Sequence, residues 1–324
     1  MPEKKLILGI DTSNYTTSAA LCTIDGEVVL NLKKLLPVAE GERGLRQSDA
    51  LFAHTKNLPE IMERLNGFLK DEYPDREIVA IGYSATPRDA EGSYMPCFLS
   101  GVAAASAVSA TVGCPAYPFS HQSGHIMAAL YSAGKTELLD SKKPFAAFHV
   151  SGGTTEILLV TPNDNGFSVE LIGGTADINA GQAIDRTGVM MGLRFPCGRE
   201  MEEMLSGREI PRAKTRISVK GLECNLSGLE NLTKKLYEET GERERVAAYC
   251  FDFVADTLCR LTENLRERYE NIPIIYAGGV MSNKRIGKRL AEYGNTYFSS
   301  PELSSDNAAG VALLCQRKLK EQIG

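Results

Sequence analysis

The fold is decided by Leu6-Ile7-Leu8-Gly9-Ile10 and the turn that follows it, Asp11-Thr12-Ser13-Asn14. A short apolar run bounded by polar turn residues is typical of a buried strand. Residues 17–24 predict a second strand, Asp25-Gly26 a hairpin turn and residues 27–32 a third strand. The unit is therefore a strand, a polar loop, a strand, a tight turn and a strand.

The same order of elements recurs later in the chain. Residues 145–150 predict a strand, Ser151-Gly152-Gly153-Thr154-Thr155 a small polar loop and residues 156–161 a second strand. A turn at residues 163–166 and a strand at 167–172 complete the repeat. A repeated unit of this kind predicts two related lobes, whose loops could offer backbone N–H groups to phosphate across a cleft. Two ordinary β-hairpins are the alternative.

Periodicity outside the repeats predicts helices and further strands, an alternation typical of an α/β fold. Helices are predicted at residues 47–69, 99–112, 120–132, 179–193, 200–205, 227–239, 243–269, 284–293 and 307–319, and strands at 77–84, 272–276 and 296–299. Residues 98–119 carry no charge and are rich in small side chains. They predict a tightly packed buried helix with its exit loop, not a membrane span.

Two of the four histidines, His121 and His125, stand four residues apart on a predicted helix. Residues i and i+4 share a helix face, so their imidazoles can bind one metal ion at about 2.0–2.1 Å each. A metalloprotease would need His-Glu-x-x-His, and Gln122 cannot act as its base. The spacing fits either a metal site without a protease base or two polar residues that open a helix.

The bulk composition is that of a globular chain long enough for two domains, with 324 residues, 43% of them hydrophobic and 24% charged. The net charge of −5 and the lack of a Lys/Arg-rich block give no indication of nucleic-acid binding. A net charge does not exclude a local basic patch. Eight cysteines without a C-x-x-C pair indicate reduced thiols in a cytoplasmic protein. We also expect no signal peptide.

Further local signals are weaker. Gly278-Gly279 follows a predicted strand and suits the close approach of a nucleotide. Asp306 precedes the last predicted helix, where an aspartate is a favoured N-cap. The common nucleotide motifs G-x-x-x-x-G-K-[ST] and G-x-G-x-x-G are absent, and no Ser-His-Asp or Cys-His nucleophile is evident.

The repeated hairpins resemble the actin/Hsp70/sugar-kinase (ASKHA) superfamily and, within it, the TsaD/Gcp family of tRNA threonylcarbamoyladenosine transferases, formerly described as O-sialoglycoprotein endopeptidases. The resemblance covers residues 6–314. The matching segments, in family order, are Ile7–Ser13 (I-L-G-I-E-T-S), Ser48–His54, His121–His125 (H-x-x-G-H), Val150–Gly153 (V-S-G-G), Asp177 with Gly181–Asp185, Pro196-Cys197-Gly198, Leu226–Leu229, Gly278–Asn283 (G-G-V-x-x-N) and Asp306–Ala309 (D-N-A-A).

This resemblance implies an α/β, two-lobed ASKHA-like fold with duplicated β-hairpin phosphate loops. It implies lobes of residues 1–115 plus about 300–324 and of residues 116–299, with a nucleotide and metal cleft between them. One divalent metal ion, iron(II) or zinc, would bind His121, His125 and Asp306. ATP or an adenylate would contact Asp11, Ser151, Gly152, Gly153, Thr154, Asp185, Gly198, Glu202, Gly279 and Asn283.

The implied activity is metal-dependent transfer of a threonylcarbamoyl group from its adenylate to the exocyclic amine of an anticodon-adjacent adenosine in tRNA. Because the electrophile is already activated, positioning and charge stabilisation suffice, and no catalytic residue is assigned. The implied partners are tRNA, threonylcarbamoyl-adenylate and other subunits of a tRNA-modification complex, in the cytoplasm and without a membrane.

The sequence departs from the family pattern at the substrate-facing motifs. The family's S-C-D-E-T is Ser13-Asn14-Tyr15-Thr16-Thr17, its G-G-H-T histidine is Thr154, an Ala-Lys pair is missing around Ala105-Ser106-Ala107, and residues 87–96 lack G-P-G. These changes predict a divergent paralogue. Two alternatives therefore stay open: a non-catalytic nucleotide- and metal-binding paralogue that supports a tRNA-modification complex, or a superfamily carbamoyl or phosphoryl transferase with another acceptor.

Overall fold

The chain forms two compact units, each with its own β-sheet. The computed structural model describes residues 4–13, 15–37, 45–164, 166–305 and 307–323. Unit 1 consists of residues up to 140, 162–168 and from 302 onward, and unit 2 of residues 141–161 and 169–301. Unit 1 thus includes both histidines of the predicted metal site. The lobe boundaries expected from the sequence, and a cleft between the lobes, stay predictions.

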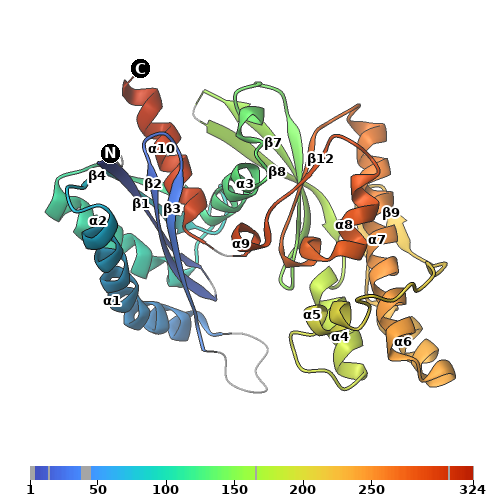
Figure 1. Cartoon of the computed structure of the whole chain (residues 1–324). Helices are drawn as coiled ribbons and strands as arrows, with labels where there is room; N and C mark the ends of the chain where they lie inside the picture. Colours follow the sequence, from blue (N-terminus) through green and yellow to red (C-terminus); the bar gives the residue numbers. More distant parts are fainter. Residues whose placement is uncertain (1–3, 14, 38–44, 165, 306, 324) are drawn as a thin grey trace. The chain divides into compact units, whose positions relative to one another are not determined.

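Unit 1 is built on a five-stranded sheet in the order β3-β2-β1-β4-β5 (Figure 1). Its strands are β1 (Lys5–Ser13), β2 (Thr16–Thr23), β3 (Val28–Leu35), β4 (Glu77–Thr86) and β5 (Ala116–Ser120). The first three are antiparallel neighbours, and β4 and β5 extend the sheet in parallel. The helices of unit 1 are α1 (Gln47–Glu72), α2 (Leu99–Val112), α3 (His121–Ser132), α9 (Pro301–Ser304, at its boundary) and α10 (Ala309–Ile323).

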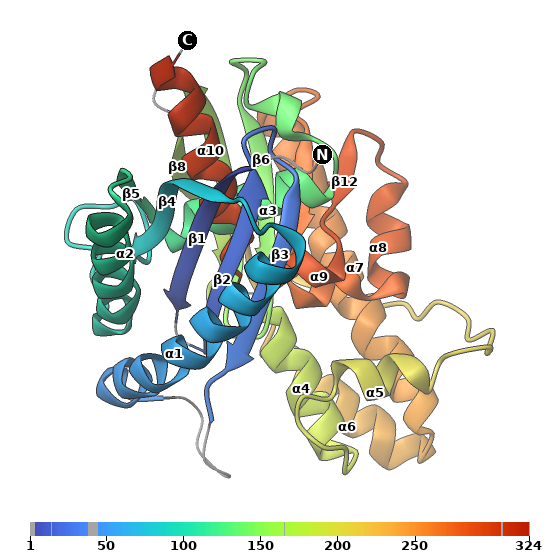
Figure 2. The same cartoon turned by 60° about the vertical axis from the view of Figure 1, so that its left-hand side comes forward.

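The alternation of side chains along β1 decides which helix covers which face of this sheet. Leu6, Leu8 and Ile10 pack in one cluster with the buried face of α1. On the opposite face a Cβ at Gly9 would lie 2.4 Å from the Ala308 carbonyl, and one at Gly82 would lie 2.2 Å from the Val311 carbonyl. Glycine is therefore required where α10 rests on the strands. Figures 1 and 2 show α1 and α10 on opposite sides of the sheet.

The prediction of a buried helix across residues 98–119 was wrong in part. The bounds of α2 are correct, but Leu99 is 45% and Val112 50% exposed, because the helix buries chiefly Ser100, Gly101 and Ala105. Its exit segment contains β5, which pairs with β4 at the edge of the sheet. Within the described residues no helix is long and apolar enough to cross a membrane.

Unit 2 carries a seven-stranded sheet in the order β12-β11-β6-β7-β8-β10-β9. Its strands are β6 (Phe145–Val150), β7 (Thr155–Asn163), β8 (Gly166–Thr175), β9 (Ser218–Lys220), β10 (Glu223–Asn225), β11 (Ile274–Ala277) and β12 (Thr296–Phe298). Its helices are α4 (Ala180–Met190), α5 (Gly198–Glu203), α6 (Gly228–Thr240), α7 (Arg243–Arg268) and α8 (Lys284–Ala291).

The two sheets repeat one topology. The order β3-β2-β1-β4-β5 in unit 1 corresponds to β8-β7-β6-β11-β12 in unit 2. In both, the first two strands are antiparallel and the last two join in parallel. Unit 2 adds β10 and β9 beyond β8. The internal repeat predicted from the hairpins is therefore confirmed, as is the α/β class.

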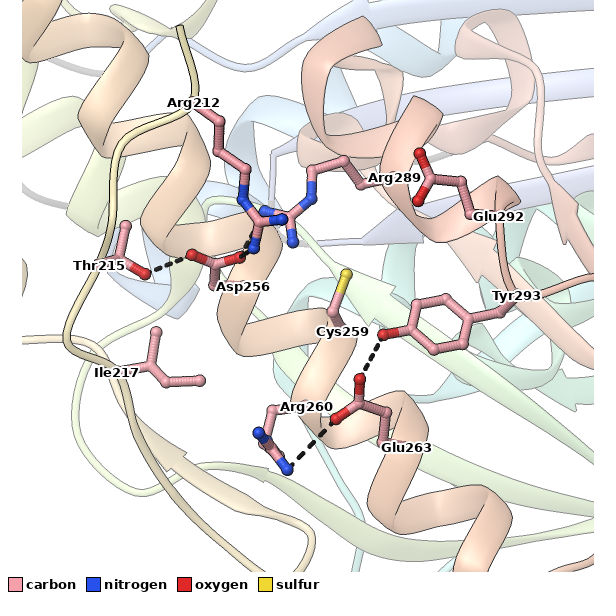
Figure 3. Close-up of a pocket in the computed structure, with 10 residues that line it drawn as sticks. All are labelled: Arg212, Thr215, Ile217, Asp256, Cys259, Arg260, Glu263, Arg289, Glu292 and Tyr293. Atoms are coloured by element: carbon pink, nitrogen blue, oxygen red, sulfur yellow. Dashed lines mark hydrogen bonds and ion pairs between the residues drawn. The ribbon is translucent and has the colours of Figure 1, made fainter.

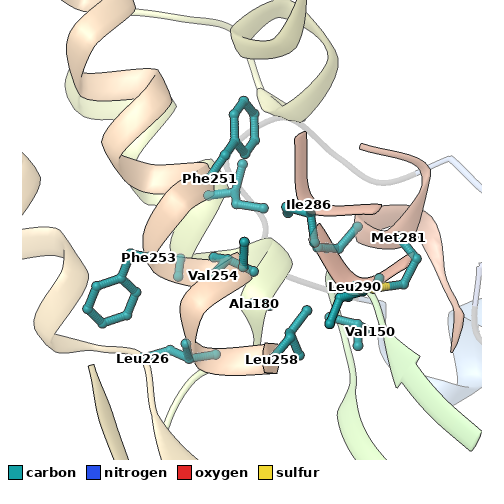
Figure 4. Packing of buried hydrophobic residues seen from close by; sticks show 14 of the residues in the cluster. Val150, Ala180, Leu226, Phe251, Phe253, Val254, Leu258, Met281, Ile286 and Leu290 are labelled. Carbon is teal, nitrogen blue, oxygen red and sulfur yellow. The ribbon is translucent and has the colours of Figure 1, made fainter. Parts of the chain in front are cut away.

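The core of unit 2 is organised around α7. Its apolar residues recur at helical spacing, and Phe251, Val254 and Leu258 are almost fully buried. They share one cluster with Ile286 and Leu290 of α8 (Figure 4). Each such buried side chain stabilises the fold by about 1.5–3 kcal/mol relative to exposure. This packing fixes α8, which begins beside the candidate nucleotide site.

The eight cysteines are all free thiols, as the absence of C-x-x-C pairs predicted. Seven are buried and Cys114 is half-buried. Burial raises the pKa of the Cys22 thiol to about 12 and that of Cys97 to about 11. Thiols with these pKa values are protonated at neutral pH, so neither is suited to act as a nucleophile or a soft metal ligand.

Candidate metal and nucleotide sites

The histidine pair lies on the first turns of α3, and a local cap fixes where that helix begins. The Ser120 hydroxyl accepts a hydrogen bond from the Ser123 backbone N–H at 3.0 Å. The Asp89 carboxylate accepts from the hydroxyls of Ser120 at 2.8 Å and Ser123 at 2.5 Å. His121 is therefore held at the first helical position. Asp89 was missed from the sequence because it lies in a loop whose partners are over thirty residues away.

The two imidazoles face each other. The Nε2 atoms of His121 and His125 are 2.9 Å apart, and the rings are edge-to-face with centroids 4.4 Å apart. Two nitrogens that each bind one ion at about 2.0–2.1 Å lie about 3 Å apart. The chemistry and spacing of this pair fit two ligands of one divalent ion. The alternative, two polar residues that open a helix, also stays open, since the same 2.9 Å separation suits a hydrogen bond between the rings.

Asp11 orients the first histidine. Its side chain is fully buried near the end of β1, and its Oδ1 lies 2.9 Å from Nδ1 of His121. A carboxylate only accepts, so Nδ1 carries the proton and Nε2 of the neutral ring keeps its lone pair for a metal. The structure thus brings Asp11 to the metal pair. Its predicted contact with a nucleotide stays a prediction.

The third predicted ligand, Asp306, lies outside the described residues. Among the residues that are described, no group of three or more His, Cys, Asp or Glu is arranged to hold a metal. Just before α10, the Asn307 Oδ1 accepts from the Ala309 N–H at 3.0 Å. A Cβ at Gly310 would lie 1.8 Å from the Gly124 carbonyl, so α10 packs directly on the helix of the histidines. The complete ligand set stays a prediction.

The first part of the candidate nucleotide site is the loop between β6 and β7. The Ser151 hydroxyl accepts from the backbone N–H groups of Gly153 at 3.3 Å and Thr154 at 3.1 Å. The Ser151 N–H donates to the Thr154 carbonyl at 2.7 Å and closes the turn. A Cβ at Gly152 or Gly153 would meet no atom within 4 Å. The loop is closed by its own hydrogen bonds, and the Cβ positions of its glycines face open space.

The start of α4 packs against this loop. The Gly181 N–H donates to the Ser151 carbonyl at 3.1 Å, and a Cβ at Gly181 would lie 2.6 Å from Cα of Gly152. The Thr155 hydroxyl accepts from the Ala180 N–H at 2.8 Å. Only glycine allows this approach, so residue 181 has a packing role that the resemblance alone did not explain.

Asp185 and Gly198 come together next to the same helix. The Asp185 Oδ1 accepts from the Cys197 N–H at 2.7 Å, one residue before Gly198 opens α5. Burial raises the pKa of Asp185, and this hydrogen bond opposes the shift only in part. The carboxylate therefore costs stability when charged, which is typical of a group retained for ligand binding.

Asn283 and Glu202 meet at the start of α8. The Asn283 Oδ1 caps the helix by accepting from the Ile286 N–H at 3.0 Å, and the Glu202 Oε1 accepts from the Lys284 N–H at 2.7 Å. Within the described residues the buried Nδ2 of Asn283 has no hydrogen-bond partner. A buried amide donor left in this state is suited to a ligand acceptor.

Gly279 lies at the other end of the same turn, and open space surrounds it. Its neighbour Gly278 adopts a φ of +100°, and a Cβ there would lie 2.3 Å from the Val150 carbonyl. The β6–β7 loop and the Gly278-Gly279 turn are therefore in contact within unit 2. No described contact joins Glu202 to this pair of turns, and its place among the nucleotide ligands stays a prediction.

A family-wide sequence profile described as "TsaD: tRNA N6-adenosine threonylcarbamoyltransferase" matches residues 39–313. The chain belongs to this family. It is thus a member of a family of transferases, as the motifs predicted. The TsaD-family match covers both units, including the histidine pair, the β6–β7 loop and the α8 start described above.

Individual relatives of this TsaD-family chain carry the same name. A tRNA N6-adenosine threonylcarbamoyltransferase of Streptococcus thermophilus strain CNRZ 1066 is 30% identical over 95% of this chain and 90% of its own length. One from the archaeon Methanopyrus kandleri is 27% identical over 95% of this chain and 86% of its own length. The similarity therefore extends over nearly the whole of both relatives.

Solved structures support the ASKHA-like fold alone. Full-length HypF, in its phosphate- and nucleotide-bound form, superposes with a TM-score of 0.62 at 12% identity over 99% of this chain, which spans 56% of HypF. Component A of the (R)-2-hydroxyglutaryl-CoA dehydratase of Acidaminococcus fermentans gives 0.50 at 15% identity, over 97% and 99% of the two chains.

One residue of the TsaD-family motifs has a role that the sequence did not reveal. The Asp177 carboxylate accepts from the backbone N–H groups of Ile178, Leu226 and Ser227 and from the Ser227 hydroxyl. Partial burial acts to raise its pKa, but these hydrogen bonds hold it well below its usual range. Asp177 therefore ties the end of β8 to the start of α6. Its partners lie about fifty residues away, beyond any local pattern.

Proposed function

We propose that this chain transfers a threonylcarbamoyl group from its adenylate to the exocyclic amine of an anticodon-adjacent adenosine in tRNA. Membership of the TsaD family supports this activity. The single observation that carries it is the pair of imidazole nitrogens 2.9 Å apart, with Asp11 holding His121 in the ligating tautomer. A protease reading lacks support because Gln122 stands where the base would be required.

Unit 1 supplies the metal-binding side chains. His121, His125 and Asp306 would hold one divalent ion, iron(II) or zinc, which when bound would polarise the carbonyl of the threonylcarbamoyl group. Asp11 fixes the orientation of the His121 ring through its Nδ1–H. The buried carboxylate thereby keeps the ligating nitrogen aimed at a single point.

Unit 2 supplies groups for the adenylate. The Ser151–Thr154 loop could bring glycine backbone close to phosphate, because a Cβ at Gly152 or Gly153 would meet no atom within 4 Å. The Asn283 Nδ2 is a buried donor suited to an acceptor on the ligand. Asp185, whose Oδ1 accepts from the Cys197 N–H next to Gly198, would accept from ribose or base. ATP would contact the same residues as a ligand.

The reaction needs no nucleophile from the protein. The adenosine N6 attacks the carbamoyl carbon and forms a C–N bond, the C–O bond to the phosphate breaks, and AMP leaves with that electron pair. The N6 amine loses one proton as the new bond forms. Binding both substrates in register supplies most of the acceleration, because the adenylate is already an activated electrophile. The absence of a nucleophile pattern in the sequence is consistent with this chemistry.

The proposal is tested by exchanging transferases. A reconstituted threonylcarbamoylation system with its own transferase removed would receive this chain, and labelled threonine on tRNA would be counted. We expect label that is lost with His121→Ala and retained with Gln122→Ala, a neighbour on the same turn. Label that persists in His121→Ala would contradict the metal-dependent reaction.

A second candidate, a non-catalytic nucleotide- and metal-binding paralogue in a tRNA-modification complex, is favoured by one region. Where the family has an acidic residue, Thr16 is only 4% exposed, and the neighbouring Thr17 hydroxyl lies 2.9 Å from Nδ1 of buried His54. The first hairpin therefore offers no carboxylate at Thr16. Binding of ATP and metal without label on tRNA, and without transfer of the γ-phosphate, would favour this candidate.

A further inference from the structure

Two carboxylates on α7 fasten an extended segment to unit 2. Residues 208–217, here called the strap, have no regular secondary structure. Asp252, only 1% exposed, accepts from the Ala213 N–H at 2.9 Å. Asp256 accepts from Arg212 at 2.6 Å and from the Thr215 hydroxyl. The strap is therefore fixed at three successive points, although it is not part of a helix or sheet.

The same carboxylates fasten α8. Arg285 binds Asp252 through two nitrogens at 2.7 and 2.8 Å, and donates to the Ile210 carbonyl of the strap at 3.3 Å. Arg289 lies 2.5 Å from Asp256. Figure 3 shows Arg212 and Arg289 reaching Asp256 side by side. Strap and α8 thus form one connected surface on α7.

A cavity of about 590 Å³ lies where the strap, α7 and α8 meet. Its charged lining is balanced: Arg212, Arg260 and Arg289 against Asp256, Glu263 and Glu292. Arg260 and Tyr293 also engage Glu263. The cavity interior therefore has no excess charge, and the excess lies on the outer side of the strap.

Exposure alternates along the outer part of this segment. Ala213, Thr215 and Ile217 are partly buried, whereas Lys214 and Arg216 between them are exposed. Ser218 and Lys220 continue the exposed series into β9. In extended chain, alternate residues are about 6.7 Å apart. The segment therefore presents two adjacent exposed cations, Lys214 and Arg216, with Lys220 two alternate positions further along the chain.

The excess positive charge is local. The whole chain has a net charge of −5, yet residues 208–220 hold five Lys or Arg and one Glu, and residues 284–291 hold four Lys or Arg and no acid. Among the described residues, the ion pairs of this region involve Arg208, Arg212, Arg285 and Arg289, and none involves Lys214, Arg216, Lys220, Lys284 or Lys288. Glu223 stands opposite Lys220 in the β9–β10 ladder and moderates that end of the segment.

We propose that the strap and the exposed side of α8 bind the phosphate backbone of the tRNA substrate. The proposal rests on the function proposed above. Exposed ammonium and guanidinium groups without carboxylate partners, carried on one extended segment, suit a polyphosphate chain, and such contacts give affinity and register but no base reading. α8 begins at Asn283, so this cationic surface is continuous with the candidate nucleotide turn of unit 2.

The test measures equilibrium binding of unmodified tRNA to the full chain, without adenylate, over a series of salt concentrations. The variant Lys214→Ala/Arg216→Ala removes two central cations, and Lys234→Ala/Lys235→Ala removes two exposed cations from α6 as its matched control. We expect the first variant to weaken binding about tenfold and to reduce the slope of log affinity against log salt by about 2. The control should match the native chain.

Thermal melting of both variants checks that folding is unchanged, and Lys214→Glu/Arg216→Glu should weaken binding further than the alanine pair. An unchanged salt slope in the strap variant, or equal losses in the strap and α6 variants, would overturn the proposal. Failure of the two proposals is distinguishable. If the strap variants transfer label as well as the native chain does, the proposed activity holds and the strap proposal fails. If tRNA binding depends on the strap but no label is transferred, the strap proposal holds and the proposed activity fails.

Discussion

The two units share one strand order, but the glycines under α10 in unit 1 differ from those at the candidate nucleotide site of unit 2. Unit 1 places Gly9 and Gly82 inside strands, where α10 lies directly on the backbone. Unit 2 places Gly152, Gly153 and Gly279 outside its strands, where open space surrounds them. In the first case glycine brings protein closer to protein, and in the second it leaves room for a ligand.

This difference decides which kind of group each unit can present. With its sheet closed by α10, unit 1 presents side chains, namely two imidazoles held by a buried carboxylate. In unit 2 the candidate groups are glycine positions where a Cβ would meet open space and the buried Asn283 amide, whose Nδ2 has no hydrogen-bond partner among the described residues. Under the proposed function, the same topology would carry the metal-binding side chains in one unit and the adenylate-binding groups in the other.

The largest expected effect sharpens the glycine contrast. Gly82→Ala should destabilise the fold by about 3 kcal/mol, because a Cβ there lies 2.2 Å from the Val311 carbonyl and neither backbone can yield cheaply. Gly152→Ala, with nothing within 4 Å, should change stability by less than about 0.5 kcal/mol. Urea unfolding of both variants measures the difference. Similar losses in the two variants would break the comparison.

The next effect concerns the side-chain site of unit 1. Asp11→Asn keeps the shape of the partner of His121 but removes its charge, and should weaken metal binding about 10- to 100-fold. Competition with a chromophoric chelator measures the affinity. Asp89→Asn is the matched control, because Asp89 contacts Ser120 and Ser123 of the same helix end but neither imidazole. Equal losses in both variants would assign Asp11 a purely structural role.

The open site of unit 2 is tested by Asn283, which has two functions in one side chain. Asn283→Asp keeps an oxygen to cap α8 but lacks the Nδ2 donor, whereas Asn283→Ala loses both. We expect the alanine variant alone to lose about 1 kcal/mol of stability, and both variants to lose stabilisation by an adenine nucleotide. Thermal melting with and without nucleotide separates the two effects. A nucleotide shift retained in Asn283→Asp would contradict the ligand role of Nδ2.

The smallest effect is a pH dependence of opposite sign for two carboxylates of unit 2. The pKa of Asp177 is lowered, so it stabilises the fold above its unfolded pKa of about 3.9 and loses this contribution as the pH falls. The pKa of Asp185 is raised, so its ionised carboxylate destabilises the fold at neutral pH. Protonation of this carboxylate at acidic pH removes that destabilisation. At pH 7, Asp177→Asn should therefore destabilise the fold and Asp185→Asn should not. Urea unfolding at pH 7 and near pH 4 checks both, and a destabilised Asp185→Asn would contradict the assignment.

Much of the fold follows from periodicity along the chain. The bounds of α2 and β6 match those predicted, because both are uniform runs between clear turn signals. β5, β9 and β10 were missed, since strands of three to five residues carry too few side chains to show a clear alternation. The exposure of α2 also could not be read from composition, because small residues are compatible with either environment.

The candidate sites were predicted where a motif is local. The facing of His121 and His125 follows from i, i+4 spacing, and the β6–β7 loop from its glycines. The pairing of Asp11 with His121 joins residues 110 positions apart, which only the fold can bring together. The ion pairs of Asp252 and Asp256 with the strap and α8 were missed for the same reason.

The division of unit 1 along the chain affects the order in which a ribosome would complete the protein. Although β1 to α3 emerge first, α10 follows the whole of unit 2. Until then the face of the sheet that holds Gly9 and Gly82 lacks its covering helix. Unit 1 therefore completes its fold last, whereas unit 2 can fold during translation before α10 has been synthesised. Truncation before residue 309 should leave nascent unit 1 dependent on chaperones, which bind exposed apolar faces of this kind.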